Sequence, residues 1–175
     1  MLYLGIDLSL TKTGWAIISV KDRRPSVIDF GLLTTDAKMS DGERLRTIVD
    51  GLHAIIAEYP DINESVAREK GIVKFPLPTM QVFKAHGAFE YALVDYNVED
   101  VPIATVKAWA RKVTGSPGKR NEKAMVAEAV TKYYGEEIGF YTKRGKLIDD
   151  ISDAIAVMTV WLIKNGIINE VGANK

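Results

Sequence analysis

The sequence predicts an α/β fold with a mixed five-stranded sheet, in which three antiparallel strands precede two parallel strands and helices flank the sheet. Two observations favour this fold class. Three strand-like apolar segments open the chain and are separated only by short polar turns, as in an antiparallel meander. Helical and strand-like segments then alternate, and a strand that is reached through a helix usually pairs in parallel with the strand before it.

The first three strands carry distinct signals. Residues 2–7 form an apolar run that ends in a carboxylate, and a second apolar run, residues 14–18, follows a polar turn. The next turn is charged and ends at Pro25, so we expect the third strand at residues 27–33. Gly31, inside that strand, is a candidate β-bulge.

Helical periodicity identifies the middle of the chain. A helix is expected at residues 41–59, capped by Ser40 or Asp41, because its apolar residues recur at steps of three and four. Residues 65–69 are expected to form the fourth strand, which again ends in a carboxylate. A second helix is predicted at residues 79–96, where apolar residues recur at the same spacing.

The last part of the chain is mostly helical. A short strand is expected at residues 101–104, parallel to the fourth strand. Three more helices are predicted at residues 105–113, 121–134 and 147–164. We therefore expect a single domain at residues 1–166 and a loosely ordered tail at residues 167–175.

Composition excludes several functional classes. The 175 residues are enough for one domain with a substantial core. The chain lacks cysteine, which excludes disulfides and thiolate metal sites. Its formal net charge is zero, which argues against non-specific coating of nucleic acid but allows a local basic patch. No apolar run reaches the roughly 18 residues of a membrane span and no secretion signal is evident, so we expect a cytoplasmic protein without a membrane partner.

Carboxylates recur at positions that can converge. Asp7 ends the first predicted strand, Glu69 ends the fourth, and Asp150 and Asp153 share one face at the start of the last helix, while Asp149 is expected to point elsewhere. If the first and fourth strands are neighbours, these groups meet at one end of the sheet. Crowded carboxylates raise one another's pKa, and divalent cations relieve this. Oxygen ligands without histidine or cysteine favour Mg²⁺ or Mn²⁺, and two such ions support phosphodiester hydrolysis.

Each of these carboxylates also has an ordinary structural interpretation. Asp7 is compatible with a turn or cap, and Glu69 with a solvated strand end. Asp150 and Asp153 are compatible with charges that complement the helix dipole. The combination, on these elements and in this order, is more specific than any single residue.

Four short motifs, spread over nearly the whole chain, support a resemblance to a known family. They are Gly5-Ile6-Asp7 with Gly14-Trp15-Ala16, Val66-Ala67-Arg68-Glu69, Thr114-Gly115 followed by Lys119 and Lys123-Ala124-Met125-Val126, and Asp150-Ile151-Ser152-Asp153-Ala154. In this order and spacing the chain resembles the RuvC-type Holliday junction resolvases of the RNase H-like superfamily. The resemblance implies an RNase H-like fold and a structure-selective endodeoxyribonuclease that resolves Holliday junctions and other branched DNA by paired, metal-dependent hydrolysis.

The resemblance also implies roles for individual residues. The catalytic and metal-binding carboxylates would be Asp7, Glu69, Asp150 and Asp153, with two Mg²⁺ or Mn²⁺ ions per active site. The enzyme would act as a homodimer on a four-way junction. The helix after the second motif would build the dimer contact through Phe83, Gly87 and Tyr91, with packing inside the chain as the alternative.

Cationic and polar residues near the predicted site are candidate DNA contacts. They are Ser9, Lys12, Lys70, Lys74, Phe75, Lys107, Lys119, Arg120 and Lys123. The structural alternative for the lysines is a solvated surface. The family usually carries an aromatic residue three positions after the glutamate, which helps open the junction. Ile72 occupies that position here, so Phe75 is the candidate replacement, a departure that resembles phage-encoded RuvC-like enzymes.

Three other functions remain open on the residues alone. The same carboxylates suit an RNase H-like nuclease that acts on RNA or an RNA–DNA hybrid. A module that binds branched DNA without cutting is a second alternative, although retention of all four carboxylates argues against it. The start of the chain also resembles the first phosphate motif of the actin and sugar-kinase fold, but the chain is too short for two such domains and lacks the Gly-rich adenosine motif.

Overall fold

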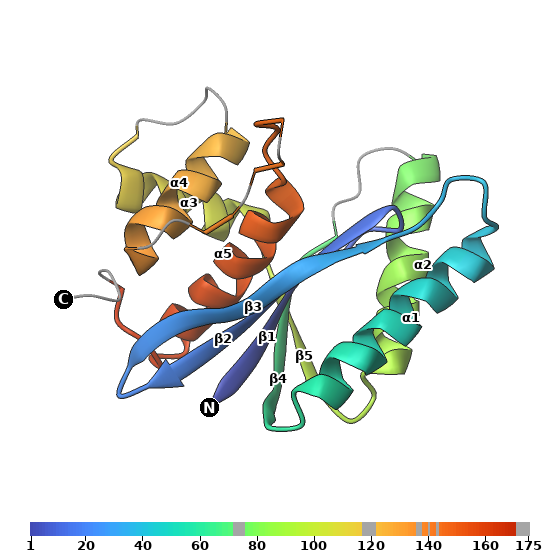
Figure 1. Cartoon of the computed structure of the whole chain (residues 1–175), viewed down its shortest axis with the longest axis horizontal. Helices are drawn as coiled ribbons and strands as arrows, with labels where there is room; N and C mark the ends of the chain where they lie inside the picture. Colours follow the sequence, from blue (N-terminus) through green and yellow to red (C-terminus); the bar gives the residue numbers. More distant parts are fainter. Residues whose placement is uncertain (72–75, 117–121, 136–137, 140, 143, 171–175) are drawn as a thin grey trace.

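The computed structural model describes residues 1–71, 76–116, 122–135, 138–139, 141–142 and 144–170, with the backbone alone for residues 76–78. Its centre is one five-stranded sheet in the order β3-β2-β1-β4-β5 (Figure 1). The strands are β1 (Leu2–Asp7), β2 (Lys12–Lys21), β3 (Arg24–Thr34), β4 (Ile62–Glu69) and β5 (Asn97–Val101). The first three pair antiparallel, whereas β1, β4 and β5 pair in parallel, so the predicted fold class is confirmed.

Helices cover both faces of the sheet. One side carries α1 (Asp41–Glu58) and α2 (Pro76–Ala92), and the other carries α3 (Ile103–Thr114), α4 (Glu122–Tyr134) and α5 (Asp149–Lys164) (Figure 1). Each side has its own hydrophobic core, because neighbouring strand residues point to opposite faces. Val66 of β4, for example, belongs to the α1–α2 core, whereas Ala67 belongs to the α5 core.

The predicted capping of α1 is confirmed. The Ser40 hydroxyl accepts a hydrogen bond from the Glu43 N–H, and the Glu43 carboxylate accepts one from the Ser40 N–H. This reciprocal capping box satisfies two N–H groups that have no partner inside the helix.

The expectation for the fifth strand and the following helix is wrong. The strand lies at Asn97–Val101 rather than at residues 101–104, and Ile103 already belongs to α3. The polar residues Glu99 and Asp100 obscure the strand in the sequence, and it forms because its backbone pairs with β4. The second helix also begins and ends earlier than expected, at Pro76 and Ala92.

Two local predictions in the meander are wrong. Pro25 lies inside β3, which is an edge strand, where the N–H that proline lacks is not needed for a ladder. The register shift falls between Ile17 and Ile18 of β2 rather than at Gly31. Gly31 instead pairs with Trp15, and a Cβ atom there would lie 2.9 Å from the indole ring.

The segment after α5, up to Glu170, packs against the rest of the chain. Ile168 is buried in the core, Arg23 donates a hydrogen bond to the carbonyl of Gly166, and Tyr133 donates one to the carbonyl of Asn169. The rest of the expected loose tail, residues 171–175, lies outside the described residues. Within the described parts, no helix combines the length and the apolar character that a membrane crossing needs.

Candidate active site

The sheet places two carboxylates at the same edge. Strands β1 and β4 are parallel neighbours, with Ile6 beside Arg68, so their last residues, Asp7 and Glu69, emerge together. This is the convergence that the sequence predicts if the first and fourth strands are adjacent.

Two glycines let the last helix approach this edge closely. Gly14 lies opposite Asp7 in the β1–β2 ladder, and a Cβ atom at Gly14 would lie only 1.9 Å from the carbonyl oxygen of Asp150. A Cβ atom at Gly5 would lie 2.5 Å from the carbonyl oxygen of Ala154. The first turn of α5 therefore rests directly on the strands. The sequence indicated both glycines only as parts of a motif and did not indicate that they leave room for the backbone of α5.

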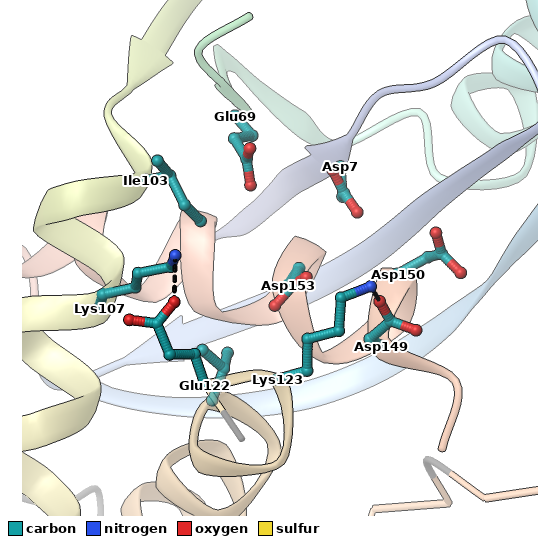
Figure 2. A pocket seen from close by; sticks show the side chains of 10 residues that line it. Asp7, Glu69, Ile103, Lys107, Glu122, Lys123, Asp149, Asp150 and Asp153 are labelled. Carbon is teal, nitrogen blue, oxygen red and sulfur yellow. Dashed lines mark hydrogen bonds and ion pairs between the residues drawn. The ribbon is translucent and has the colours of Figure 1, made fainter. Parts of the chain in front are cut away.

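The carboxylates line one open cavity of about 330 Å³ between the sheet edge, α3, α4 and α5 (Figure 2). Its lining consists of Asp7, Glu69, Ile103, Lys107, Glu122, Lys123, Val126, Asp149, Asp150 and Asp153. All four carboxylates chosen from the sequence are present. Asp149 also lines the cavity, contrary to the expectation that it points elsewhere.

Burial and mutual repulsion disfavour the ionised forms of these carboxylates. Burial, followed by the charges of Glu69 and Asp153, holds the pKa of Asp7 well above its usual value. Burial and Glu69 raise the pKa of Asp153 to about 7. The pKa values of Glu69 and Asp150 are raised as well, in both cases chiefly by burial. A site that stabilises protonated acids in this way has a deficit of positive charge.

The donor set fits hard divalent cations. It contains carboxylate oxygens without histidine or cysteine, which suits Mg²⁺ or Mn²⁺ better than Zn²⁺. As the side chains lie, the described residues contain no cluster of three that holds one ion. This is compatible with Mg²⁺, which commonly binds through one or two carboxylates and takes its other ligands from water and substrate phosphates.

Two lysines reach into the cavity, and each is paired with a carboxylate. The Lys107 ammonium of α3 lies 2.6 Å from a carboxylate oxygen of Glu122, and Lys123 of α4 pairs with Asp149 of α5 (Figure 2). Sequence reasoning selected both lysines but missed Glu122. Its position beside Lys123, in the first turn of α4, was the available signal.

The other candidate DNA contacts are dispersed. Lys12 is exposed, and its positive charge opposes the effect of burial on the pKa values of Asp149 and Asp150, so it lies near the site. The Ser9 hydroxyl accepts the Lys12 N–H and donates to the Lys12 carbonyl, so it braces the turn. Lys70 is exposed beside Glu69. The remaining candidates, Lys74, Phe75, Lys119 and Arg120, lie outside the described residues, as does Ile72.

The predicted interface residues lie on the outer face of α2. Phe83 and Tyr91 are 50% and 82% exposed, and a Cβ atom placed at Gly87 would point into open space beside the helix. The opposite face carries the buried Ala85 and Phe89. Within the described chain, other elements therefore leave much of this outer face uncovered.

A buried arginine connects α2 and β5 to β4, next to the sheet edge that carries Asp7 and Glu69. Arg68, the residue before Glu69, lies 2.7 Å from the Asp100 carboxylate and 2.5 Å from that of Glu90, and it stacks over Phe89. The Arg68 side chain is only 6% exposed. Sequence reasoning missed this network, because Arg68 meets Asp100 and Glu90 only after folding.

Comparison with known proteins identifies the family. The family described as Crossover junction endodeoxyribonuclease RuvC matches residues 3–161. The RuvC protein of Synechocystis sp. is 30% identical over 97% of this chain and 95% of its own length. That of Alkaliphilus oremlandii is 32% identical over 90% of each chain.

Solved structures agree on the fold. The structure of T. thermophilus RuvC in complex with a Holliday junction substrate has a TM-score of 0.72 at 20% identity, covering 91% of this chain and 92% of that one. The Fowlpox virus resolvase in its complex with Holliday junction DNA has a TM-score of 0.57 at 15% identity, covering 94% and 99%. The match of the family model across residues 3–161 and the relatives that are 30% and 32% identical over 90% or more of this chain lead to one conclusion: the chain belongs to the RuvC family of crossover junction endodeoxyribonucleases.

Proposed function

We propose that this protein is a metal-dependent endonuclease that resolves four-way DNA junctions, as the names of its relatives indicate. The single observation that carries this proposal is the convergence of Asp7, Glu69, Asp150 and Asp153 on one cavity, from two strands and one helix that are distant in the sequence. Burial disfavours the charge of each of these groups, which is a costly arrangement unless cations use it.

The four carboxylates would hold two Mg²⁺ or Mn²⁺ ions. When bound, such ions activate a water molecule and stabilise the leaving oxygen in phosphodiester hydrolysis. Asp7 and Glu69 are held by the sheet, whereas Asp150 and Asp153 are held by the first turns of α5. The two pairs of carboxylates therefore have fixed positions relative to each other. Lys107 and Lys123 bring positive charge to the same cavity, where a DNA phosphate must enter.

The remaining candidate DNA contacts extend the proposed path of the DNA. Lys12 and Lys70 are exposed near the cavity and suit phosphate contacts. Ser9 would act mainly by holding the turn that carries Lys12. Phe75 remains the candidate wedge residue, and Lys74, Lys119 and Arg120 remain candidate phosphate contacts.

The exposed stripe of α2 supports a homodimer with one active site in each protomer. Met80, Phe83 and Tyr91 of α2 are 56%, 50% and 82% exposed, and together with Gly87 they recur at steps of three and four. Val94, in the turn after the helix, is 77% exposed. An exposed apolar stripe of this spacing suits a helix–helix contact, and glycine at its centre permits close approach. Two such sites on one dimer would nick a junction symmetrically.

A cleavage assay on three substrates tests the proposed function. A labelled four-way junction, a linear duplex and an RNA–DNA hybrid are each incubated with Mg²⁺, Mn²⁺ or EDTA. We expect paired nicks in the junction with either metal and none in EDTA. Cleavage confined to the hybrid would favour the RNase H-like alternative, and junction binding without any cleavage would favour the binding module.

Asp7→Asn tests the assignment of the site. The amide keeps the shape of the side chain but removes the charge that would hold a cation, so we expect cleavage to be lost while junction binding is kept. Glu128→Gln is the matched control, because Glu128 pairs with Lys132 on α4 and does not line the cavity. Normal cutting by Asp7→Asn would refute the assigned metal site.

A further inference from the structure

The two lysines of the cavity are not free in the folded chain. Lys107 is held 2.6 Å from Glu122, and Lys123 is held by Asp149 (Figure 2). Neither Glu122 nor Asp149 belongs to the four carboxylates assigned to the metal ions. Both line the cavity, however, and thereby add negative charge to a site that is already rich in it.

These carboxylates contact the same ammonium groups that a DNA phosphate in the cavity would contact. Each places an anionic oxygen at hydrogen-bonding distance from a lysine that faces the proposed substrate cavity, and each pair joins two helices across its wall. A phosphate that enters the cavity offers the same kind of oxygen to the same ammonium group. The carboxylate and the phosphate therefore compete for one cation.

We propose that Glu122 and Asp149 occupy the lysines that would otherwise bind DNA phosphates. In this way the two carboxylates lower the affinity of the cavity for DNA of any structure. This inference rests on the proposed function, because it requires that DNA enters the cavity. Non-specific DNA binding arises almost entirely from free cations that displace counterions from phosphates. A lysine already paired with a carboxylate of its own chain contributes less to that term, and the displaced carboxylate then repels the DNA.

The ion pairs are weak enough to yield to the correct substrate. The side chains of Lys107 and Glu122 are 31% and 38% exposed, and those of Lys123 and Asp149 are 69% and 25% exposed. Ion pairs that remain in contact with water contribute little to stability, so each lysine can exchange its partner at small cost. The formal net charge of zero is in keeping with a DNA enzyme that limits its general attraction to DNA.

Binding of a linear duplex to Glu122→Gln tests the inference. The dissociation constant is measured in EDTA, which prevents cleavage. It is measured at several salt concentrations between 50 and 200 mM, because its salt dependence reports the number of phosphate contacts. Freeing Lys107 should tighten duplex binding by about fivefold near 0.1 M salt and steepen the logarithmic salt dependence by roughly 0.9, the contribution of one phosphate contact. Asp149→Asn should act in the same direction through Lys123.

Controls separate the inference from its alternatives. Glu128→Gln removes the same charge from α4 outside the cavity and should leave duplex affinity unchanged. The double variant Glu122→Gln with Lys107→Gln should lose the gain, because the freed cation is gone. Unchanged or weaker duplex binding by Glu122→Gln, in a variant with an unaltered melting temperature, would overturn the inference. If the wild-type protein cuts junctions, that outcome leaves the proposed function standing, whereas a wild-type protein that neither binds nor cuts junctions overturns both.

Discussion

Asp153 makes the metal-free protein less stable as the pH rises. Its pKa is raised from an ordinary value of 3.8 to about 7, mainly by burial and then by the charge of Glu69. At about 1.4 kcal/mol per pKa unit, this difference corresponds to about 4 kcal/mol. The folded state binds the proton more tightly than the unfolded state. The free energy of unfolding is therefore unaffected below pH 3.8, falls as the pH rises, and has lost the full amount above pH 7.

The variant Asp153→Asn isolates this effect, because an amide has a similar shape and never ionises. We expect the variant to be as stable as the wild type near pH 4 and about 4 kcal/mol more stable at pH 8, although it cannot cut DNA. The measurement is urea unfolding in EDTA at intervals from pH 4 to pH 8. Saturating Mg²⁺ should narrow the gap at pH 8, since an ion that binds only the folded wild type stabilises it. A stability difference that does not change with pH would refute the reasoning.

Three further variants test the structural basis of the site. Gly14→Ala places a Cβ atom 1.9 Å from the carbonyl oxygen of Asp150, so α5 must move, and we expect a lower melting temperature and loss of junction cleavage. Gly42→Ala is the control: a Cβ atom there meets open space, so its melting temperature should be no lower than that of the wild type. Arg68→Met leaves Asp100 and Glu90 without their cation and should lower the free energy of unfolding by about 2 kcal/mol, measured in urea. An unchanged midpoint would show that the network adds no stability. Phe83→Glu should shift the protein from dimer to monomer in sedimentation analysis without lowering its melting temperature, since the side chain is half exposed. A Phe83→Glu protein that remains dimeric would contradict the assigned interface.

Local patterns along the chain predict much of the fold. Alternating and continuous apolar runs indicate β1 and β2, and the steps of three and four indicate α1. The sequence limited the cap of α1 to Ser40 or Asp41, and the structure places it at Ser40. Asp7 was recognisable because it ends an apolar strand, where a carboxylate is unusual, whereas Glu69 was chosen as the carboxylate at the end of the fourth strand. These signals are local, since they depend on propensities and periodicities that act over a few residues.

Other features depend on contacts between distant segments and have no local signal. The strand β5 is polar and short, and its pairing with β4 defines it, which is why it was expected too late in the chain. The apolar residues of α2 are visible in the sequence, but only packing decides that Phe89 faces the core while Tyr91 faces outward.

The active site shows the same division. The sequence by itself determined the types of its carboxylates and the elements that carry them. Only the tertiary structure decided that Asp149 faces the cavity and pairs with Lys123, and that Glu122 also lines the cavity. It also decided that Gly14 lets α5 pack directly on the sheet. The physical reason is that a side chain's role depends on the charge and volume of its neighbours, and folding brings those neighbours from remote parts of the chain.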